Sequence, residues 1–132
     1  MHLICGGKLH TMIDHLSIRV SNYERSKEFY ARALAPVGYK LLFEHPISGA
    51  GFGRDIKPTF WIKQGPPSPV LHVAFAADDR ATVEAFHRAA VAAGGRDNGG
   101  PGLRPEYHPD YFGAFVLDPD GHNIEAVCHT KP

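Results

Sequence analysis

The chain has 132 residues, of which 43% are hydrophobic; this suits one domain with a real core and is too short for two independent domains. Fourteen basic and fourteen acidic residues cancel, so no net field favours nucleic acid or an anionic membrane. No apolar stretch approaches the roughly 20 residues that span a bilayer. We therefore expect neither nucleic acid nor a membrane as a partner.

The first eleven residues, MHLICGGKLHT, are set apart from the rest of the chain. They lack the long apolar core of a signal peptide, so residues 1–11 are interpreted as an N-terminal tail or as the result of a start codon upstream of Met12. Cys5 in this tail and Cys128 near the other terminus do not force a disulfide, and a cytoplasmic location is expected. The remaining residues, 12–132, are predicted to form a single domain.

The first unit of this domain, residues 12–64, opens with a strand and a helix. Apolar and polar residues alternate in IDHLSIRV, which is typical of a half-buried strand. The S-x-x-E pattern beginning at Ser21 predicts the start of a helix, which stops near Gly38. YKLLFEH and PTFWIKQG are predicted strands, and the glycines at 49, 51 and 53 between them mark a loop or an irregular hairpin.

The second unit, residues 70–129, repeats this order after a seam rich in Gly and Pro at 65–69. PVLHVAFAA is a predicted strand, and one of two consecutive aspartates, Asp78 or Asp79, can cap the helix that follows. The long loop NGGPGLRPEYHPDYFG leads to two strands, GAFVLDP and HNIEAVCH, joined by a D-P-D-G hairpin turn. Each unit therefore contains a strand, a helix, and two or three further strands.

The two units look like copies of each other. A shift of 57 residues places His15 on His72 and Phe29 on Phe86. Each histidine lies on the polar face of its strand, opposite the apolar face on which a helix packs, so both line a concave interior if each sheet curls away from its helix. Two neutral imidazoles at one pseudo-symmetric centre form half a metal site, and Glu125 could complete it.

The most specific motif is the run Asp118-Pro119-Asp120-Gly121-His122-Asn123-Ile124-Glu125, which accompanies Asp14-His15 and Leu71-His72 on the first strand of each unit. With these motifs the chain, from Met12 to about His129, resembles the vicinal oxygen chelate superfamily, which includes glyoxalase I, extradiol dioxygenases, thiol transferases and bleomycin-resistance proteins. The resemblance implies an α+β fold in which two βαβββ repeats form an eight-stranded, open, cup-shaped mixed sheet with helices packed outside. It also implies a homodimer and a divalent metal ion in the cup.

Carried over position by position, His15, His72 and Glu125 match the metal ligands of this superfamily. Two imidazoles and one carboxylate hold one face of an octahedral ion and leave neighbouring positions open. Glyoxalase I usually takes a fourth ligand from the last strand of its first unit, where this chain has Trp61. A three-ligand site fits dioxygenases and thiol transferases, favours Fe or Mn over Zn, Ni or Co, and leaves Trp61 as an aromatic wall of the substrate pocket.

Further candidates lie around this proposed centre. His108 is the candidate catalytic residue, because its spacing to the final motif is similar to that of extradiol dioxygenases, although a solvated loop is the more ordinary explanation. The residues expected to bind substrate are Trp61, Arg19, the loop tyrosines Tyr107 and Tyr111, and Asn123. The guanidinium of Arg19 can form a bidentate pair with a substrate carboxylate. His122 is expected at the turn or surface, and His129 shares the strand face of Glu125.

The leading hypothesis is a metal-dependent enzyme that acts on a small oxygenated molecule chelated to a divalent ion. The chemistry is either of the dioxygenase type or of the lactoylglutathione lyase type. The alternatives are a non-catalytic protein of the bleomycin-resistance type, which binds a small molecule or antibiotic, and a thiol transferase. The sequence identifies neither the substrate nor the metal, and it leaves open whether the site closes within one chain or across two.

Overall fold

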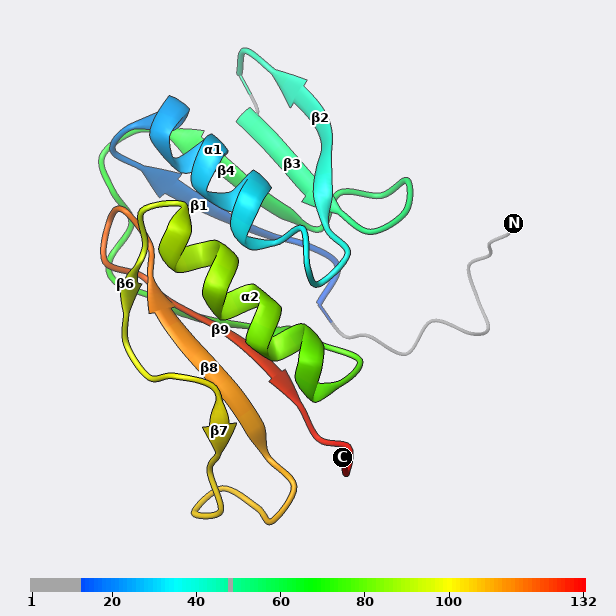
Figure 1. The fold of residues 1–132 in the computed structure, drawn as a ribbon. Coiled ribbons are helices and arrows are strands. Elements are labelled where there is room, and N and C mark those ends of the chain that lie inside the picture. The colour runs from blue at the N-terminus through cyan, green and yellow to red at the C-terminus, as the bar shows by residue number, and fades with distance from the viewer. Residues whose placement is uncertain (1–12, 48) are drawn as a thin grey trace.

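A computed structural model describes residues 13–47 and 49–132 (Figure 1). The first repeat contains β1 (Leu16–Val20), α1 (Tyr23–Ala33), β2 (Lys40–His45), β3 (Gly49–Gly53) and β4 (Phe60–Gln64). The second contains β5 (His72–Ala76), α2 (Arg80–Ala92), β6 (Arg96–Asp97), β7 (Gly102–Leu103), β8 (Phe112–Leu117) and β9 (Asn123–Cys128). The N-terminal tail predicted over residues 1–11 lies outside the described residues.

Both repeats have the same sheet topology. Sheet A has the strand order β1-β4-β3-β2, and sheet B has the order β5-β9-β8-β6, with β7 also paired to β8. In each sheet the first strand runs parallel to the last, and the other pairs are antiparallel. The short strands β6 and β7 pair with successive stretches of β8, so together they act as one interrupted edge strand.

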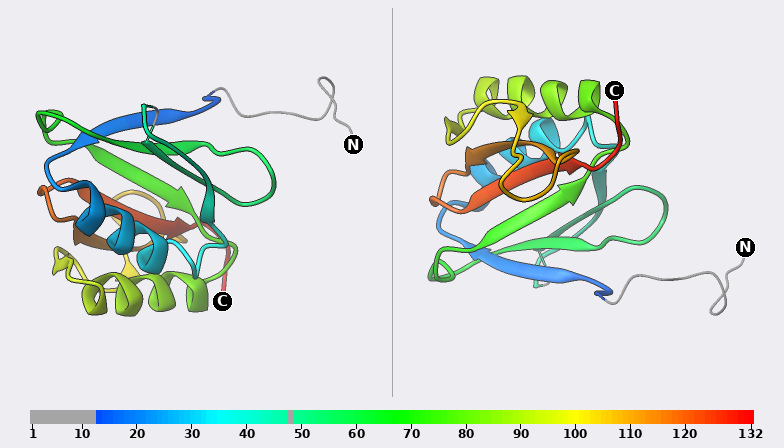
Figure 2. Two further views of the ribbon diagram at one scale, coloured as in Figure 1. Left: turned by 90° about the horizontal axis from the view of Figure 1, so that it is seen from above. Right: turned by 90° about the horizontal axis from the view of Figure 1, so that it is seen from below.

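This arrangement confirms the α+β class and the two βαβββ repeats. Within the described part of the chain the strands form two separate sheets, with β1 at an edge of sheet A and β5 at an edge of sheet B. The two helices lie side by side and cover one face of the sheets (Figures 1 and 2). Among residues 13–47 and 49–132, no helix lies on the opposite face of either sheet.

One hydrophobic core runs through both repeats. The predicted alternation in the first strand of each repeat places Ile18, Val20 and Phe75 in this core, where they meet Phe29 of α1 and Phe86 of α2. Burying a side chain of this size contributes about 1.5–3 kcal/mol. The shared core fixes the two sheets relative to each other and thereby positions their open faces.

The D-P-D-G turn between β8 and β9 also joins the repeats. Asp118 is only 4% exposed, and its Oδ1 accepts hydrogen bonds from the backbone N–H of Asp120 at 2.9 Å and of His122 at 2.8 Å. Its other oxygen accepts a hydrogen bond from the hydroxyl of Tyr30 in α1. Asp120 accepts from the backbone and the hydroxyl of Ser21, just before α1. The carboxylates of this motif therefore hold the first helix in place.

Two local predictions are wrong. Helix α1 is capped by Asn22 and not by Ser21, because the Ser21 hydroxyl is engaged by the turn between β8 and β9, while Asn22 accepts a hydrogen bond from the backbone N–H of Arg25 at 3.1 Å. His122 is expected at the turn or the surface. Its backbone does close the turn through Asp118, but the surface position is wrong, because the side chain is fully buried and its Nδ1 accepts a hydrogen bond from the backbone N–H of Leu71 at 3.0 Å. This contact ties the start of β9 to the start of β5.

Two open alternatives are resolved by the structure. The glycine-rich segment 49–53 is strand β3, and it forms a hairpin with β2 whose register shifts between Leu41 and Phe43, so the irregular hairpin is confirmed. Of the two candidate caps of α2, Asp79 is the one used, since its carboxylate accepts from the backbone N–H of Thr82 at 2.8 Å.

Neither α1 nor α2, the helices that the structure describes, has the length and apolar character needed to cross a membrane.

Candidate functional site

His72 and Glu125 meet on the open face of sheet B. In the parallel pair β5–β9, His72 is opposite Asn123 and Ala74 is opposite Glu125, so the two functional side chains share one face. The Nε2 atom of His72 lies 2.7 Å from Oε1 of Glu125. The Glu125 side chain is 1% exposed and that of His72 is 54% exposed, so an accessible imidazole covers a buried carboxylate.

The second oxygen of this carboxylate is held by Tyr111, whose hydroxyl donates a hydrogen bond to Oε2 of Glu125. Burial and this contact raise the pKa of Tyr111 to about 12. The phenol is therefore neutral, and a hydrogen-bond donor, throughout the range near pH 7. Both oxygens of the buried carboxylate have partners, as the burial of a charged group requires.

Tyr111 belongs to a cluster of rings at the end of sheet B. Nε2 of His108 lies 2.6 Å from Nδ1 of His129, and the two rings stack with centroids 4.9 Å apart. The Tyr111 ring lies edge-on to both imidazoles and to Tyr107. The Nδ1 atom of His108 accepts a hydrogen bond from the backbone N–H of Asp110, which leaves Nε2 as its donor toward His129 when both rings are neutral.

His15 lies on the other sheet, immediately before β1. Its side chain is 56% exposed, and its Nδ1 is 2.9 Å from a carboxylate oxygen of Asp14, which also accepts from Nζ of Lys57 at 2.7 Å. The hydrogen bonds from Lys57 and then His15 hold the pKa of Asp14 below its usual value. Over the described ranges 13–47 and 49–132, no three His, Cys, Asp or Glu side chains come together. Within one chain, therefore, His72 and Glu125 of the predicted metal triad lie together and His15 does not join them.

Trp61 occupies in sheet A the place that Glu125 occupies in sheet B. Two residues after each repeat's histidine, Ser17 is opposite Trp61 in β1–β4, and Ala74 is opposite Glu125 in β5–β9. This register supports the alignment in which the indole replaces a fourth ligand.

A hollow of about 490 Å³ lies on the open face of sheet A. It is lined by His15, Ser17, Lys57, Pro58, Trp61 and Lys63. The Trp61 ring lies so close to Gly51 that a Cβ at this glycine would be 2.9 Å from the indole. The half-exposed ring of Phe43 packs edge-on against Trp61, with the ring centroids 5.9 Å apart. Trp61 is therefore a wall of a hollow that also contains one predicted metal ligand.

The two remaining predicted substrate-binding residues are engaged by other parts of the protein. Nε of Arg19 donates to the carbonyl of Pro66 at 3.0 Å, and the Arg19 backbone N–H donates to the Ser68 hydroxyl at 2.9 Å. These bonds tie Arg19 to the linker between the repeats. Asn123 is half-buried, and its side-chain oxygen accepts from the amide of Asn98 at 3.2 Å.

Arg104 is a residue of this face that the sequence pattern does not single out. Its guanidinium lies 5.3 Å above the ring of Phe115, and Phe115 is opposite Glu125 in the β8–β9 pair. The same phenyl ring is 6.1 Å from the imidazole of His72. Arg104 follows β7 in the long loop, and no local periodicity reveals that the loop folds back over β8.

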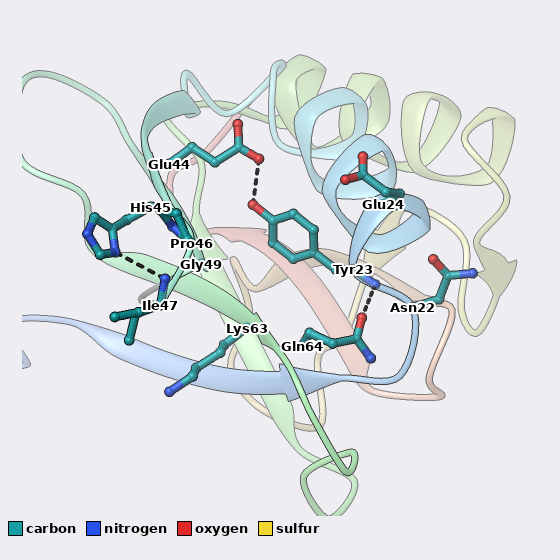
Figure 3. A pocket seen from close by; sticks show the side chains of 10 residues that line it. All are labelled: Asn22, Tyr23, Glu24, Glu44, His45, Pro46, Ile47, Gly49, Lys63 and Gln64. Atoms are coloured by element: carbon teal, nitrogen blue, oxygen red, sulfur yellow. Dashed lines mark hydrogen bonds between the residues drawn. The ribbon is translucent and has the colours of Figure 1, made fainter.

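A hollow of about 630 Å³ opens between the start of α1 and the β2–β3 hairpin (Figure 3). Within it the Tyr23 hydroxyl donates to Glu44 at 2.6 Å, and Lys27 approaches the same carboxylate at 2.7 Å. Burial and the Glu44 contact raise the pKa of Tyr23 to about 12. Although this hollow is larger, it contains none of the predicted site residues and several of its polar groups bind each other, so we place the site on the open sheet faces.

The geometry of His72 and Glu125 fits part of a divalent metal site. Two neighbouring ligand atoms, each about 2.1 Å from an octahedral ion, lie about 3 Å apart. The observed separation of 2.7 Å between Nε2 and Oε1 is close to this value. An imidazole nitrogen and a carboxylate oxygen suit Fe, Mn, Zn, Ni and Co. A third protein ligand has to come from outside this pair.

Comparison with known proteins agrees with the fold described above. A family model for the Glyoxalase/Bleomycin resistance protein/Dioxygenase superfamily matches residues 12–126. A glyoxalase/bleomycin resistance protein from Albidiferax ferrireducens T118 is 29% identical, with a TM-score of 0.79, and the match covers 89% of this chain and 99% of that chain.

Two more distant solved structures share the fold. A glyoxalase/bleomycin resistance protein/dioxygenase family enzyme from Burkholderia phytofirmans PsJN is 17% identical, with a TM-score of 0.69, and the match covers 89% of this chain and 98% of that chain. The V278E mutant of glyoxalase I from Zea mays is 22% identical with a TM-score of 0.65; the match covers 87% of this chain and 43% of that chain.

Proposed function

Since this chain belongs to the glyoxalase/bleomycin resistance protein/dioxygenase superfamily, we propose that it is a metal-dependent enzyme acting on a small oxygenated molecule, by dioxygenase-type or lyase-type chemistry. The observation that carries the proposal is the contact between His72 and Glu125, a buried carboxylate and an accessible imidazole 2.7 Å apart. A divalent ion bound there would act as a Lewis acid on neighbouring substrate oxygens.

The third ligand in this proposal is His15 of a second copy of the chain. In the part of the chain that the structure describes, each sheet has one face without a helix. His15 lies on this face of sheet A, and the His72–Glu125 pair lies on this face of sheet B. When sheet A of one chain faces sheet B of its partner, two equivalent cups close around a two-fold axis, as in most homodimers. The half-exposed Phe43 would be covered in the same step.

The residues around the pair have separate roles in this mechanism. Tyr111, protonated near pH 7, fixes the orientation of Glu125 through its second oxygen. The stacked imidazoles of His108 and His129 lie at the same end of the sheet, where a shared hydrogen bond can pass a proton to or from bound substrate. Trp61 would exclude water from the opposite wall.

Metal uptake tests the proposal directly. Equilibrium dialysis against Mn²⁺ or Fe²⁺, followed by elemental analysis, is expected to give about one ion per chain for the wild type and at least tenfold weaker uptake for His72→Ala and Glu125→Ala. His87→Ala is the matched control, because His87 pairs with Asp97 at 2.9 Å, outside the site. Wild-type uptake no greater than that of the two site variants would remove the basis of the enzyme proposal.

Mixing two defective chains tests the shared site. His15→Ala and Glu125→Ala homodimers each lack a ligand in both cups. After unfolding and refolding together, a mixed dimer has one cup with His15, His72 and Glu125 all present, and about a quarter of all cups are expected to recover metal binding. A site closed within one chain would give no recovery on mixing.

A second candidate function is metal-independent binding of a small molecule. The observation that favours it is the aromatic wall formed by Trp61 and Phe43 in the position of a fourth ligand. Trp61 is the only tryptophan, so its fluorescence reports on this wall. Ligand-induced quenching that is unchanged by a chelator and by Glu125→Ala would favour the binding protein over the enzyme.

A further inference from the structure

We propose that Arg104 binds a carboxylate of the ligand, so that the substrate class is small organic acids. This inference deepens the proposed function, because it rests on the open face of sheet B being the ligand-binding face. It does not depend on a metal ion, since it concerns a different group on that face.

The guanidinium of Arg104 is held in a fixed position. The Arg104 backbone N–H donates to the carbonyl of Tyr111 at 2.8 Å, and Nη2 donates to the carbonyl of Gly100 at 2.8 Å. A Cβ at Gly99 would lie 3.0 Å from the Phe115 ring and 3.2 Å from Nη2 of Arg104, so the chain passes close to both groups. An arginine that is already ordered loses less conformational entropy when it binds a ligand.

The charge of Arg104 is not matched by a carboxylate of the protein. No Asp or Glu within residues 13–47 and 49–132 forms an ion pair with it, and its partners are backbone carbonyls and the face of Phe115. Arginine has five side-chain N–H donors, and the carbonyls of Gly100 and Leu103 use only part of them. A half-buried cation with spare donors is a site for an anion.

Arg104 also lies where a ligand of the His72–Glu125 pair would extend. The centroid of the Phe115 ring lies 6.1 Å from that of the His72 ring and 5.3 Å from the central guanidinium carbon of Arg104. All three groups therefore share one stretch of the open face. A molecule whose oxygens approach the pair can extend its carbon skeleton past the phenyl ring and place an acidic end against Arg104.

The surroundings favour a carboxylate over a phosphate. The guanidinium fork matches the two oxygens of a carboxylate in a bidentate pair. In the metal-free protein, the buried Glu125 carboxylate on the same face repels a doubly charged phosphate more strongly than a singly charged carboxylate. A singly charged organic acid therefore fits the metal-free face better than a phosphate ester.

Benzoate and benzamide, which differ in charge and not in shape, are suitable probes. Their binding to metal-free protein in the presence of EDTA is measured by calorimetry and by NMR shifts of the arginine N–H groups. Wild type is expected to bind benzoate at least tenfold more tightly than benzamide, and Arg104→Gln is expected to reduce this ratio to about one. Arg104→Lys keeps the positive charge but lacks the paired N–H donors of the guanidinium, so its ratio of benzoate to benzamide affinity is expected to lie between those of the wild type and Arg104→Gln. Arg96→Gln, at an exposed arginine of β6, is the control and keeps the wild-type ratio.

Equal affinity for the two probes, a preference that survives in Arg104→Gln, or no benzoate binding by wild type would overturn the inference. Tighter binding of inorganic phosphate than of benzoate would overturn the carboxylate assignment. Thermal denaturation checks that each variant is folded. The outcome separates the two proposals: normal metal uptake without benzoate binding refutes only the role of Arg104, whereas Arg104-dependent benzoate binding without metal uptake refutes only the metal enzyme.

Discussion

At the scale of single residues, Glu125 is both ionisable and fully buried. A buried carboxylate is stable only when its oxygens are hydrogen-bonded, and here His72 and Tyr111 each hold one oxygen. Tyr111 would not itself touch the proposed metal ion. Its hydrogen bond instead fixes the direction in which Glu125 presents its other oxygen, and such supporting contacts strongly affect metal affinity.

The variant Tyr111→Phe tests this role. We expect metal affinity to fall by about 10- to 100-fold, which is the usual effect of losing a hydrogen bond that supports a ligand. Titration calorimetry with Mn²⁺ measures the change. Tyr107→Phe, on an exposed neighbour in the same ring cluster, is expected to bind metal like the wild type. Equal losses in the two variants would refute a specific role for the Tyr111 hydroxyl.

Tyr30 provides the corresponding test for stability. It is completely buried, and its hydroxyl donates to Asp118 across the two repeats. Tyr30→Phe leaves one buried carboxylate oxygen without this partner, so the free energy of unfolding is expected to fall by about 1–3 kcal/mol. Urea denaturation measures it, again with Tyr107→Phe as the control. An unchanged denaturation midpoint would show that the contact contributes nothing.

The sequence is informative about residues that lie on strands. Strict alternation of sides predicts that His72 lies on the polar face of its strand. It places Glu125 on one face with Val127 and His129 and leaves open which face points inward; the register of β5 and β9 brings His72 and Glu125 together. It does not predict Arg104, because a loop contact depends on the path of the chain and not on a period. The burial of His122 is missed for the same reason, since its environment comes from the distant Leu71.

At the scale of elements, the glycines of β3 show where pattern alone is insufficient. Gly51 faces the Trp61 ring, and a Cβ at Gly53 would lie 2.3 Å from the carbonyl oxygen of Lys57. Close approach of neighbouring groups thus explains glycines that resemble a loop in the sequence. The start of α1 is misplaced by one residue because Ser21 and Asn22 are both good caps, and only the distant Asp120 decides between them.

The cap of α2 gives a prediction with a defined pH dependence. Hydrogen bonds from Thr82 hold the pKa of Asp79 below its usual value of 3.8. A lowered pKa stabilises the folded protein above about pH 4, and this contribution disappears as the pH falls through the folded-state pKa. We expect Asp79→Ala to lower the melting temperature at pH 7 by a few degrees and to lower it less at pH 3.

The neighbouring Asp78→Ala is the matched control for this cap, because Asp78 is exposed and is not the residue that caps the helix. Its melting temperature is expected to follow that of the wild type at both pH values. If Asp79→Ala destabilises the protein equally at pH 7 and pH 3, the carboxylate charge is not the cause of the effect.

At the scale of the whole molecule, three tyrosines with raised pKa values shape the response to alkali. Partial burial and the Glu125 contact raise the pKa of Tyr111 to about 12, and partial burial and the Glu44 contact do the same for Tyr23. Complete burial raises the pKa of Tyr30 well above its usual value of 10. An unfolded tyrosine ionises near pH 10. The folded state therefore binds these protons more tightly than the unfolded state does. The resulting contribution to the free energy of unfolding is fully present below pH 10 and is lost as the pH rises toward 12.

The expected result is a steep decrease in the urea midpoint between pH 10 and pH 11.5, measured by circular dichroism. Tyr111→Phe removes one of the three contributions, so its midpoint is expected to decline less steeply than that of the wild type over this interval. Parallel curves for the two proteins would contradict this explanation.

The repeated topology is the part of the fold that the sequence predicts best. A shift of 57 residues aligns the repeats, and the two sheets follow the same strand order. How the two sheets sit relative to each other is not encoded by any local period, because it depends on packing between distant faces. The separation of His15 from the His72–Glu125 pair in one chain is for this reason visible only in three dimensions.

The turn between β8 and β9 also has a consequence for synthesis on the ribosome. Asp118 and Asp120 anchor residues that precede them by 88 and 99 positions. The N-terminal helix leaves the exit tunnel long before these carboxylates are made, so during translation it lacks its anchors. We expect the native state to form only after the final hairpin emerges, and a nascent chain stalled before that point to remain a substrate for chaperones and proteases.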